Sequence, residues 1–218
     1  MAFEATRADD PDSPVRRVYW VDQVHGTRVI RVDGVRDGDA VGHLGRATPP
    51  SVAAVCAGTG DGLVASAPSV CLAVLTADCV SLALGSPEGV FGTVHAGWRG
   101  LVAGVVEEAV AAMRSLGASD VVGALGPCIH PGCYEFGKDD LGTVAAVYGD
   151  RVRSCTTAGR PALDLPAAVS AALVASGAEE VAGSSSCTAC SDGYFSHRAR
   201  GDTGRQALVV WAQAPPRS

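Results

Sequence analysis

Two histidines and a cysteine are the side chains of this 218-residue sequence best suited to bind a soft metal ion: His25, Cys79 and His95. They lie 54 and 16 residues apart, which is not zinc-finger spacing, so only the fold could bring them together. Two imidazoles and one thiolate suit Zn²⁺ and leave a fourth position open for water or substrate, as in catalytic zinc sites. From spacing alone, a buried free cysteine with two hydrogen-bonded histidines is the commoner arrangement.

A second chemical signal follows His95 directly, where Trp98 and Arg99 share one Gly-rich turn. The turn joins an apolar segment at 90–94 to apolar residues that recur at helical spacing from Leu101. Anions bind at helix N-termini, and the planar guanidinium of Arg99 suits phosphate or carboxylate. The alternative is a plain connection with a solvated arginine, but a His, a Trp and an Arg together favour a site.

Two carboxylates could assist this chemistry. Asp78, next to Cys79, and Asp164 could each orient a ligand or act as a general base. The alternative role is a turn or cap carboxylate, which we favour for Asp164.

The remaining cysteines give weaker signals. Cys187 and Cys190 form a lone Cys-x-x-Cys pair, which without a second pair nearby indicates neither a zinc knuckle nor a redox motif. Cys128 and Cys133 are interpreted as structural.

Composition limits the partners. A net charge of −6 and a pI near 5.3 argue against nucleic acid or an anionic membrane surface, while a small anionic substrate could still bind a few local arginines. The first sixteen residues are charged and contain no apolar signal segment, and no apolar run approaches the roughly 18 residues of a membrane span. We therefore expect a cytoplasmic protein with reduced cysteines.

The hydrophobic pattern predicts strands that often follow one another directly. We expect strands at 18–21, 28–32, 61–65, 70–75, 80–84, 90–94, 121–125, 180–182 and 206–211, helices at 101–116, 139–148 and 166–176, and a loop at 33–50. This order favours an α/β (α+β) fold with mixed β-sheets flanked by helices. We expect a partly ordered segment at 1–17 and one compact domain at 18–218.

Seven ordered motifs give the sequence a family resemblance. They are Gln-Val-His-Gly-Thr at 23–27, Leu-Thr-Ala-Asp-Cys at 75–79, His-Ala-Gly-Trp-Arg-Gly at 95–100, Leu-Gly-Pro-Cys-Ile at 125–129, Cys-Tyr-Glu at 133–135, Leu-Asp-Leu at 163–165, and Tyr-Phe-Ser-His-Arg at 194–198 with Thr-Gly-Arg at 203–205. Together they resemble the YfiH/laccase-domain family, also labelled polyphenol oxidase or purine nucleoside phosphorylase. Cys187-Thr188-x-Cys190 also resembles the family pattern, which favours a structural role for that pair.

The resemblance implies a compact α/β fold related to a toxin-type cysteine deamidase. It implies a zinc ion held by His25, Cys79 and His95, and phosphorolysis of adenosine, inosine, guanosine and methylthioadenosine, with some adenosine deamination. Phosphate would then bind at Arg99, with Arg198 or Arg205 as further partners. One departure concerns the start of the chain, where only residues 5–7 and 9–11 resemble the family's opening segments, so specificity or activity could differ.

Three alternatives to a zinc-dependent phosphorylase stay open. A copper oxidase could use two histidines and a cysteine, but only three of the five histidines would remain for an oxygen-reducing cluster, so copper is disfavoured. A cysteine hydrolase or amidase, acting for example on cytoplasmic peptidoglycan precursors, would use Cys79 as nucleophile and His95 as base. A binding module with a structural zinc would need four protein ligands, and the sequence offers three. The oligomeric state is not predicted.

Overall fold

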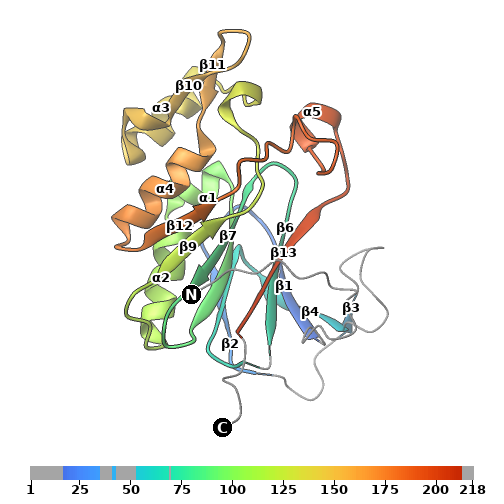
Figure 1. The fold of residues 1–218 in the computed structure, drawn as a ribbon, viewed down its shortest axis with the longest axis vertical. Coiled ribbons are helices and arrows are strands. Elements are labelled where there is room, and N and C mark those ends of the chain that lie inside the picture. Colours follow the sequence, from blue (N-terminus) through green and yellow to red (C-terminus); the bar gives the residue numbers. More distant parts are fainter. Residues whose placement is uncertain (1–16, 35–40, 43–52, 69, 213–218) are drawn as a thin grey trace.

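Two β-sheets and a layer of helices make up the described part of the chain, residues 17–34, 41–42, 53–68 and 70–212 of the computed structural model (Figure 1). The central sheet has six strands in the order β12 (Glu179–Gly183), β9 (Val122–Leu125), β7 (Val80–Gly85), β8 (Phe91–Ala96), β5 (Gly62–Ala65) and β2 (Val29–Val32). Its inner pairs are antiparallel and its two outer pairs are parallel.

The second sheet has five strands in the order β13 (Gln206–Trp211), β6 (Cys71–Thr76), β1 (Arg17–Asp22), β4 (Ala53–Thr59) and β3 (Val41–Gly42). It is parallel at β6–β1–β4 and antiparallel at both edges. A short hairpin of β10 (Arg153–Cys155) and β11 (Pro161–Leu163) projects beyond the helices. The prediction of mixed sheets flanked by helices is therefore confirmed.

The central sheet is covered on both faces, which explains its apolar strands. Helices α2 (Val105–Ser115) and α4 (Leu165–Ala175) pack on one face, joined by α1 (Trp98–Ala103) and α3 (Lys138–Tyr148), and the five-stranded sheet covers the other. Every residue of β7 and β8 is buried, so these strands need apolar or small side chains on both sides. Cys79 directly precedes β7 and His95 lies near the end of β8, so this buried layer positions both residues.

One predicted helix is wrong in its bounds. The segment 101–116 was expected to be continuous, but α1 begins at Trp98 and ends at Gly104, which has φ 96° and starts α2. Only glycine adopts this left-handed conformation readily, so Gly104 breaks the helical repeat although the apolar spacing continues through it.

Several short elements escaped the sequence prediction. Strand β4 consists largely of small residues without a strong period, and β10, β11, the 3₁₀ turns η1 (Pro131–Cys133) and η2 (Asp150–Val152), and α5 (His197–Arg200) are too short to show one. The predicted partly ordered segment falls, at residues 1–16, outside the described residues, and so does most of the predicted loop, at 35–40 and 43–50.

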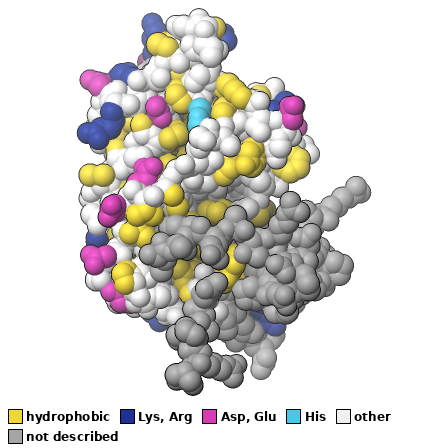
Figure 2. All heavy atoms as spheres, viewed as in Figure 1, with side chains coloured by type: hydrophobic (Ala, Val, Ile, Leu, Met, Phe, Trp, Pro, Cys, Tyr) yellow, Lys and Arg dark blue, Asp and Glu magenta, His cyan; other side chains and the backbone are white. Residues whose placement is uncertain are grey.

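Two observations concern the described helices and the face of the molecule that Figure 2 shows. None of the described helices has the length and apolarity required to cross a bilayer. On the described part of the face in Figure 2, acidic and basic side chains are interspersed along the helices.

Candidate metal centre

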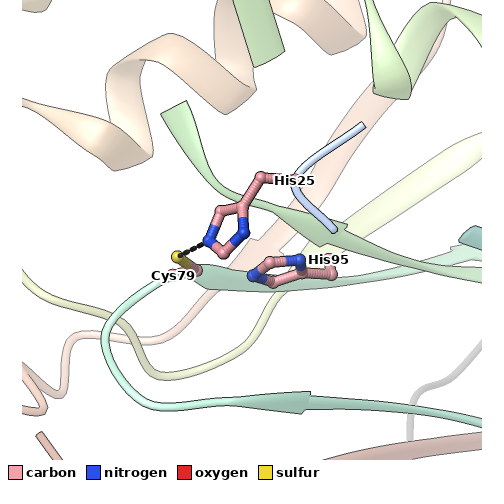
Figure 3. A group of neighbouring side chains, drawn as sticks. All are labelled: His25, Cys79 and His95. Atoms are coloured by element: carbon pink, nitrogen blue, oxygen red, sulfur yellow. Dashed lines mark hydrogen bonds between the residues drawn. The ribbon is translucent and has the colours of Figure 1, made fainter. Parts of the chain in front are cut away.

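The structure brings His25, Cys79 and His95 together from three separate segments (Figure 3). His25 lies in the loop after β1, Cys79 in the turn between β6 and β7, and His95 in β8. One ligand atom from each lies within 4.8 Å of the others, and Cys79 Sγ is 4.0 Å from His25 Nε2. Tetrahedral zinc, with Zn–S near 2.3 Å and Zn–N near 2.0 Å, separates a sulfur and a nitrogen ligand by about 3.5 Å. The donor set and its spacing therefore fit a metal ion after a small contraction.

A buried carboxylate that the sequence reasoning missed supports both histidines. Asp61 has no exposed surface, and its Oδ1 lies 2.8 Å from His95 Nδ1. A proton on Nδ1 leaves His95 Nε2 free as a ligand atom, the arrangement that carboxylate partners impose on metal-binding histidines. Asp61 also accepts hydrogen bonds from the backbone N–H groups of Val24, His25 and Gly26 at 3.2, 2.9 and 2.7 Å. One side chain thus fixes a ring on β8 and a loop after β1.

The residues next to Asp61 in the sequence could have indicated that it is buried. It lies between two glycines, Gly60 and Gly62, at the start of an apolar strand. A Cβ atom at Gly60 would lie 2.8 Å from the carbonyl oxygen of Arg28, so glycine is needed for the backbone to approach this closely. An acidic residue enclosed in this way indicates a buried carboxylate with partners, but the partners cannot be named from the sequence.

The loop that carries His25 is held at its other end by Gln23. The Gln23 amide donates to the Leu75 carbonyl and accepts from the Leu75 N–H, both at 2.8 Å, and so extends the pairing of the five-stranded sheet. His25 itself has φ 58°, an uncommon conformation for a residue other than glycine. Its retention here indicates that the surrounding hydrogen bonds fix the loop in one shape.

Gly97 leaves room for the centre. A Cβ atom at this position would lie 2.7 Å from His25 Cδ2 and 3.2 Å from Cys79 Sγ. Any other residue would therefore displace the His25 ring or the thiol.

The protonation of the centre is coupled. Burial raises the pKa of Cys79, but hydrogen bonds with His25 and His95 outweigh it and lower that pKa from 9.0 to about 7. Burial likewise lowers the pKa of His95, but its hydrogen bonds to Asp61 and Cys79 raise it to about 9. In the metal-free centre, the thiolate form of Cys79 and the imidazolium form of His95 therefore stabilise each other.

Asp78 lies beside the centre but is occupied by other partners. Its carboxylate accepts hydrogen bonds from the hydroxyls of Thr188 and Ser196 and from the N–H of Arg198, each at 2.7 Å. It is buried, and its φ of 91° is unusual for a residue other than glycine. Asp78 therefore joins the turn that carries Cys79 to the C-terminal loop.

An aromatic wall with two guanidinium groups stands next to the centre. The ring of Phe136 makes edge contacts with Trp98 and Tyr134 at centroid distances of 5.4 and 5.2 Å. Arg99 lies over the Trp98 ring at 4.4 Å, and Arg198 lies over the Tyr134 ring at 4.9 Å. Both arginines are exposed. Arg198 Nη1 donates to the Glu135 carbonyl at 2.9 Å, and the remaining N–H groups of the two guanidinium groups can reach a ligand.

The electrostatics of Tyr134 link this wall to the centre. Burial raises the pKa of Tyr134 to about 12; the charges of Cys79 and Asp78 add to the rise, and those of Arg198 and Arg99 oppose it. The sequence reasoning missed Tyr134 and Phe136 because aromatic residues near a turn usually belong to the core.

The remaining residues singled out from the sequence have other contacts in the structure. Arg205 donates to the carbonyls of Asp202 and Gly204 in its own loop, at 3.0 and 2.7 Å. Asp164 caps α4 by accepting from the Ala167 N–H at 3.0 Å, the role that we favoured. Cys128 is fully enclosed in the core, whereas Cys133 lies beside the Cys-x-x-Cys pair, a proximity that we did not expect.

Fold and site together define a mixed-sheet α/β protein with a His–Cys–His centre beside an arginine-lined aromatic wall. The chain belongs to the family described as multi-copper polyphenol oxidoreductase laccase, whose model matches residues 5–213. The predicted resemblance to the YfiH/laccase-domain family is thereby confirmed.

Named relatives and solved structures agree with this family. The chain is 41% identical over 198 residues to a purine nucleoside phosphorylase of Streptomyces griseus, covering 89% of this chain and 74% of the relative. It is 36% identical over 204 residues to a purine nucleoside phosphorylase of Mycobacterium tuberculosis, covering 92% and 74%.

Among solved structures, the chain resembles the hypothetical protein YfiH of Bacillus licheniformis, with a TM-score of 0.74, 28% identity and coverage of 92% of this chain and 76% of that one. It also resembles YlmD from Geobacillus stearothermophilus, with a TM-score of 0.71, 30% identity and coverage of 92% and 75%. The names of the relatives indicate an enzyme that acts on small molecules.

Proposed function

We propose that the chain is a zinc-dependent purine nucleoside phosphorylase acting on adenosine, inosine, guanosine and methylthioadenosine, with adenosine deamination as a second activity. The observation that carries the proposal is the convergence of His25, Cys79 and His95 beside two exposed guanidinium groups. The names of relatives 36–41% identical to this chain support the reaction.

In the proposal, Arg99, Arg198 and Arg205 bind the phosphate. Helix α1 has only six residues, so its N-terminus supplies a smaller partial charge than a long helix, and the guanidinium groups carry more of the binding. Arg99 and Arg198 hold their planar groups against aromatic rings, which orients the N–H forks in advance. Arg205 is a further phosphate ligand in the proposal, once released from its own loop.

In the proposal, the residues of the metal centre hold the zinc ion and orient the side chains that bind it. A zinc ion bound by His25, Cys79 and His95 would supply a Lewis acid and lower the pKa of a bound water. Asp61 keeps the His95 proton on Nδ1 and thereby directs Nε2 into the centre. We propose that Asp78 acts as a positioning residue rather than as a base, because its two oxygens already accept three hydrogen bonds.

Release of hypoxanthine from inosine, measured with and without phosphate on metal-loaded protein, tests the proposal. Arg99→Ala and Arg198→Ala should each raise the KM for phosphate about 10- to 100-fold, since a hydrogen bond to a charged group contributes about 1.5–3 kcal/mol. Arg153→Ala is the matched control, because that arginine pairs with Asp150 in η2. Base release that does not require phosphate, or unchanged KM values in both variants, would contradict the proposal.

A second function is favoured by one further observation. Cys79, His95 and Asp61 form a thiol–imidazole–carboxylate series, the arrangement that activates a cysteine nucleophile. A cysteine hydrolase or amidase acting on peptidoglycan precursors would cleave an amide without phosphate and would be blocked by alkylation of Cys79. The same inosine assay run with alkylated protein and an amide substrate separates the two functions.

Copper chemistry is the least favoured function despite the family description. The chain has five histidines, and two of them lie at the centre, which leaves three for a multicopper cluster. Metal analysis of purified protein decides between zinc and copper, and oxygen consumption with a phenol substrate tests the oxidase directly.

A further inference from the structure

A second group of sulfur ligands lies outside the proposed centre. Cys133 is the last residue of η1, and its thiol lies near the pair Cys187 and Cys190, so that the three Sγ atoms lie within 4.8 Å of one another. Cys133 Sγ is 3.0 Å from Cys190 Sγ, although the two residues are 57 positions apart in the chain. The fold therefore supplies the third thiol that a lone Cys-x-x-Cys pair lacks.

The spacing of these sulfurs suits a shared ion. In tetrahedral coordination with Zn–S near 2.3 Å, two sulfurs lie about 3.8 Å apart. The three thiols lie within 4.8 Å of one another, and the Cys133–Cys190 pair, at 3.0 Å, would move apart slightly to bind an ion between them. All eight cysteines of the chain are free, and the 3.0 Å separation is well beyond the roughly 2.05 Å of a disulfide bond. Thiolates are the ligands that select zinc among common divalent ions.

Two backbone hydrogen bonds hold the three cysteines near one another. The N–H of His130 donates to Cys187 Sγ at 3.4 Å, and the Thr188 N–H donates to the Cys128 carbonyl at 3.0 Å. The first contact favours a thiolate at Cys187, and the second lays the loop alongside the 128–133 turn. Cys133 and Cys187 are partly buried and Cys190 is exposed, so solvent can fill a fourth position.

We propose that Cys133, Cys187 and Cys190 bind a second zinc ion, a structural one, with water as the fourth ligand. Binding releases the thiol protons and forms three zinc–sulfur bonds without any redox step. The ion would tie the loop from 187 onward to the 131–135 turn. That loop supplies Thr188 and Ser196 to Asp78, so the second ion would stabilise one wall of the proposed active site.

Zinc content in a protein that lacks the first centre tests this inference separately from the proposed function. The variant His25→Ala/Cys79→Ser, purified with a reductant and without chelators, should retain about one zinc ion per chain by plasma mass spectrometry. Adding Cys187→Ser/Cys190→Ser should remove it, whereas adding Cys56→Ser, an exposed thiol on β4, should not.

A spectroscopic measurement covers the case in which the quadruple variant does not fold. Cobalt added to the folded His25→Ala/Cys79→Ser protein should give the near-ultraviolet thiolate charge-transfer band, weakened by the single change Cys190→Ser at the exposed ligand. Three results would overturn the inference: no zinc in the starting variant, no cobalt–thiolate band, or a Cys133–Cys190 disulfide in the anaerobic, reduced protein.

Discussion

Replacing Asp61 by asparagine tests the centre most directly, because it keeps the size of the side chain and removes its charge. The carboxylate accepts from His25 N and His95 Nδ1 at Oδ1, and from Val24 N and Gly26 N at Oδ2. In Asn, one of these positions becomes an NH₂ group that faces two donors. With the NH₂ group at Oδ1, His25 N and His95 Nδ1 lose their acceptor; with it at Oδ2, Val24 N and Gly26 N lose theirs, which loosens the loop on both sides of His25.

The structure sets the size of this effect. An unsatisfied buried donor costs about 1–3 kcal/mol, and since the backbone donors here are only partly buried, Asp61→Asn should lower the free energy of unfolding by about 1–3 kcal/mol in total. Loss of a carboxylate that orients a metal ligand should weaken zinc binding about 10- to 100-fold. The cause is misplacement of the histidines, so both effects should appear in the same variant.

Competition with a chromophoric chelator measures the zinc affinity, and urea unfolding of the metal-free protein measures the stability. Asp164→Asn is the matched control: the same chemical change at the N-cap of α4, where the Asn Oδ1 can still accept from Ala167 N, should leave both stability and zinc affinity nearly unchanged. Equal zinc affinities in Asp61→Asn and Asp164→Asn would refute the assigned role of Asp61.

Three further predictions concern glycines and the thiol of the centre. Gly97→Ala should weaken zinc binding at least about tenfold with little loss of fold, because its Cβ would meet the His25 ring, whereas Gly142→Ala, whose Cβ meets nothing within 4 Å, should leave chelator competition unchanged. In urea unfolding, Gly104→Ala should destabilise the protein by about 1–2 kcal/mol because of its left-handed φ of 96°, while Gly142→Ala in the middle of α3 should stabilise it by about 0.5–1 kcal/mol; the same sign for both would contradict the assignment. In metal-free protein, alkylation of Cys79 followed by mass spectrometry should rise with pH through a midpoint near 7, because a lowered pKa populates the thiolate at lower pH, and a midpoint near that of an ordinary thiol, about 8.5, would count against the coupling with the histidines.

The sequence by itself determined the element types and the ligand types. Continuous apolar runs at 70–75 and 80–84 predict strands that are buried on both faces, and the structure has β6 and β7 there. Histidine and cysteine at strand ends indicate soft-metal chemistry wherever they lie, since the donor atoms belong to the residue type. Element type and ligand type depend on nearby residues, so the spacing and the residue types are enough to predict them.

Only the tertiary structure decided which residues meet. His25 and Cys79 are separated by 54 residues, and the register of two different sheets brings Nε2 and Sγ to 4.0 Å. Asp61 carries no sequence pattern that names its four donors, and Cys133 is 57 residues from the thiol that it approaches. Such contacts depend on sheet order and on loop shapes fixed by buried hydrogen bonds, and neither has a period along the chain.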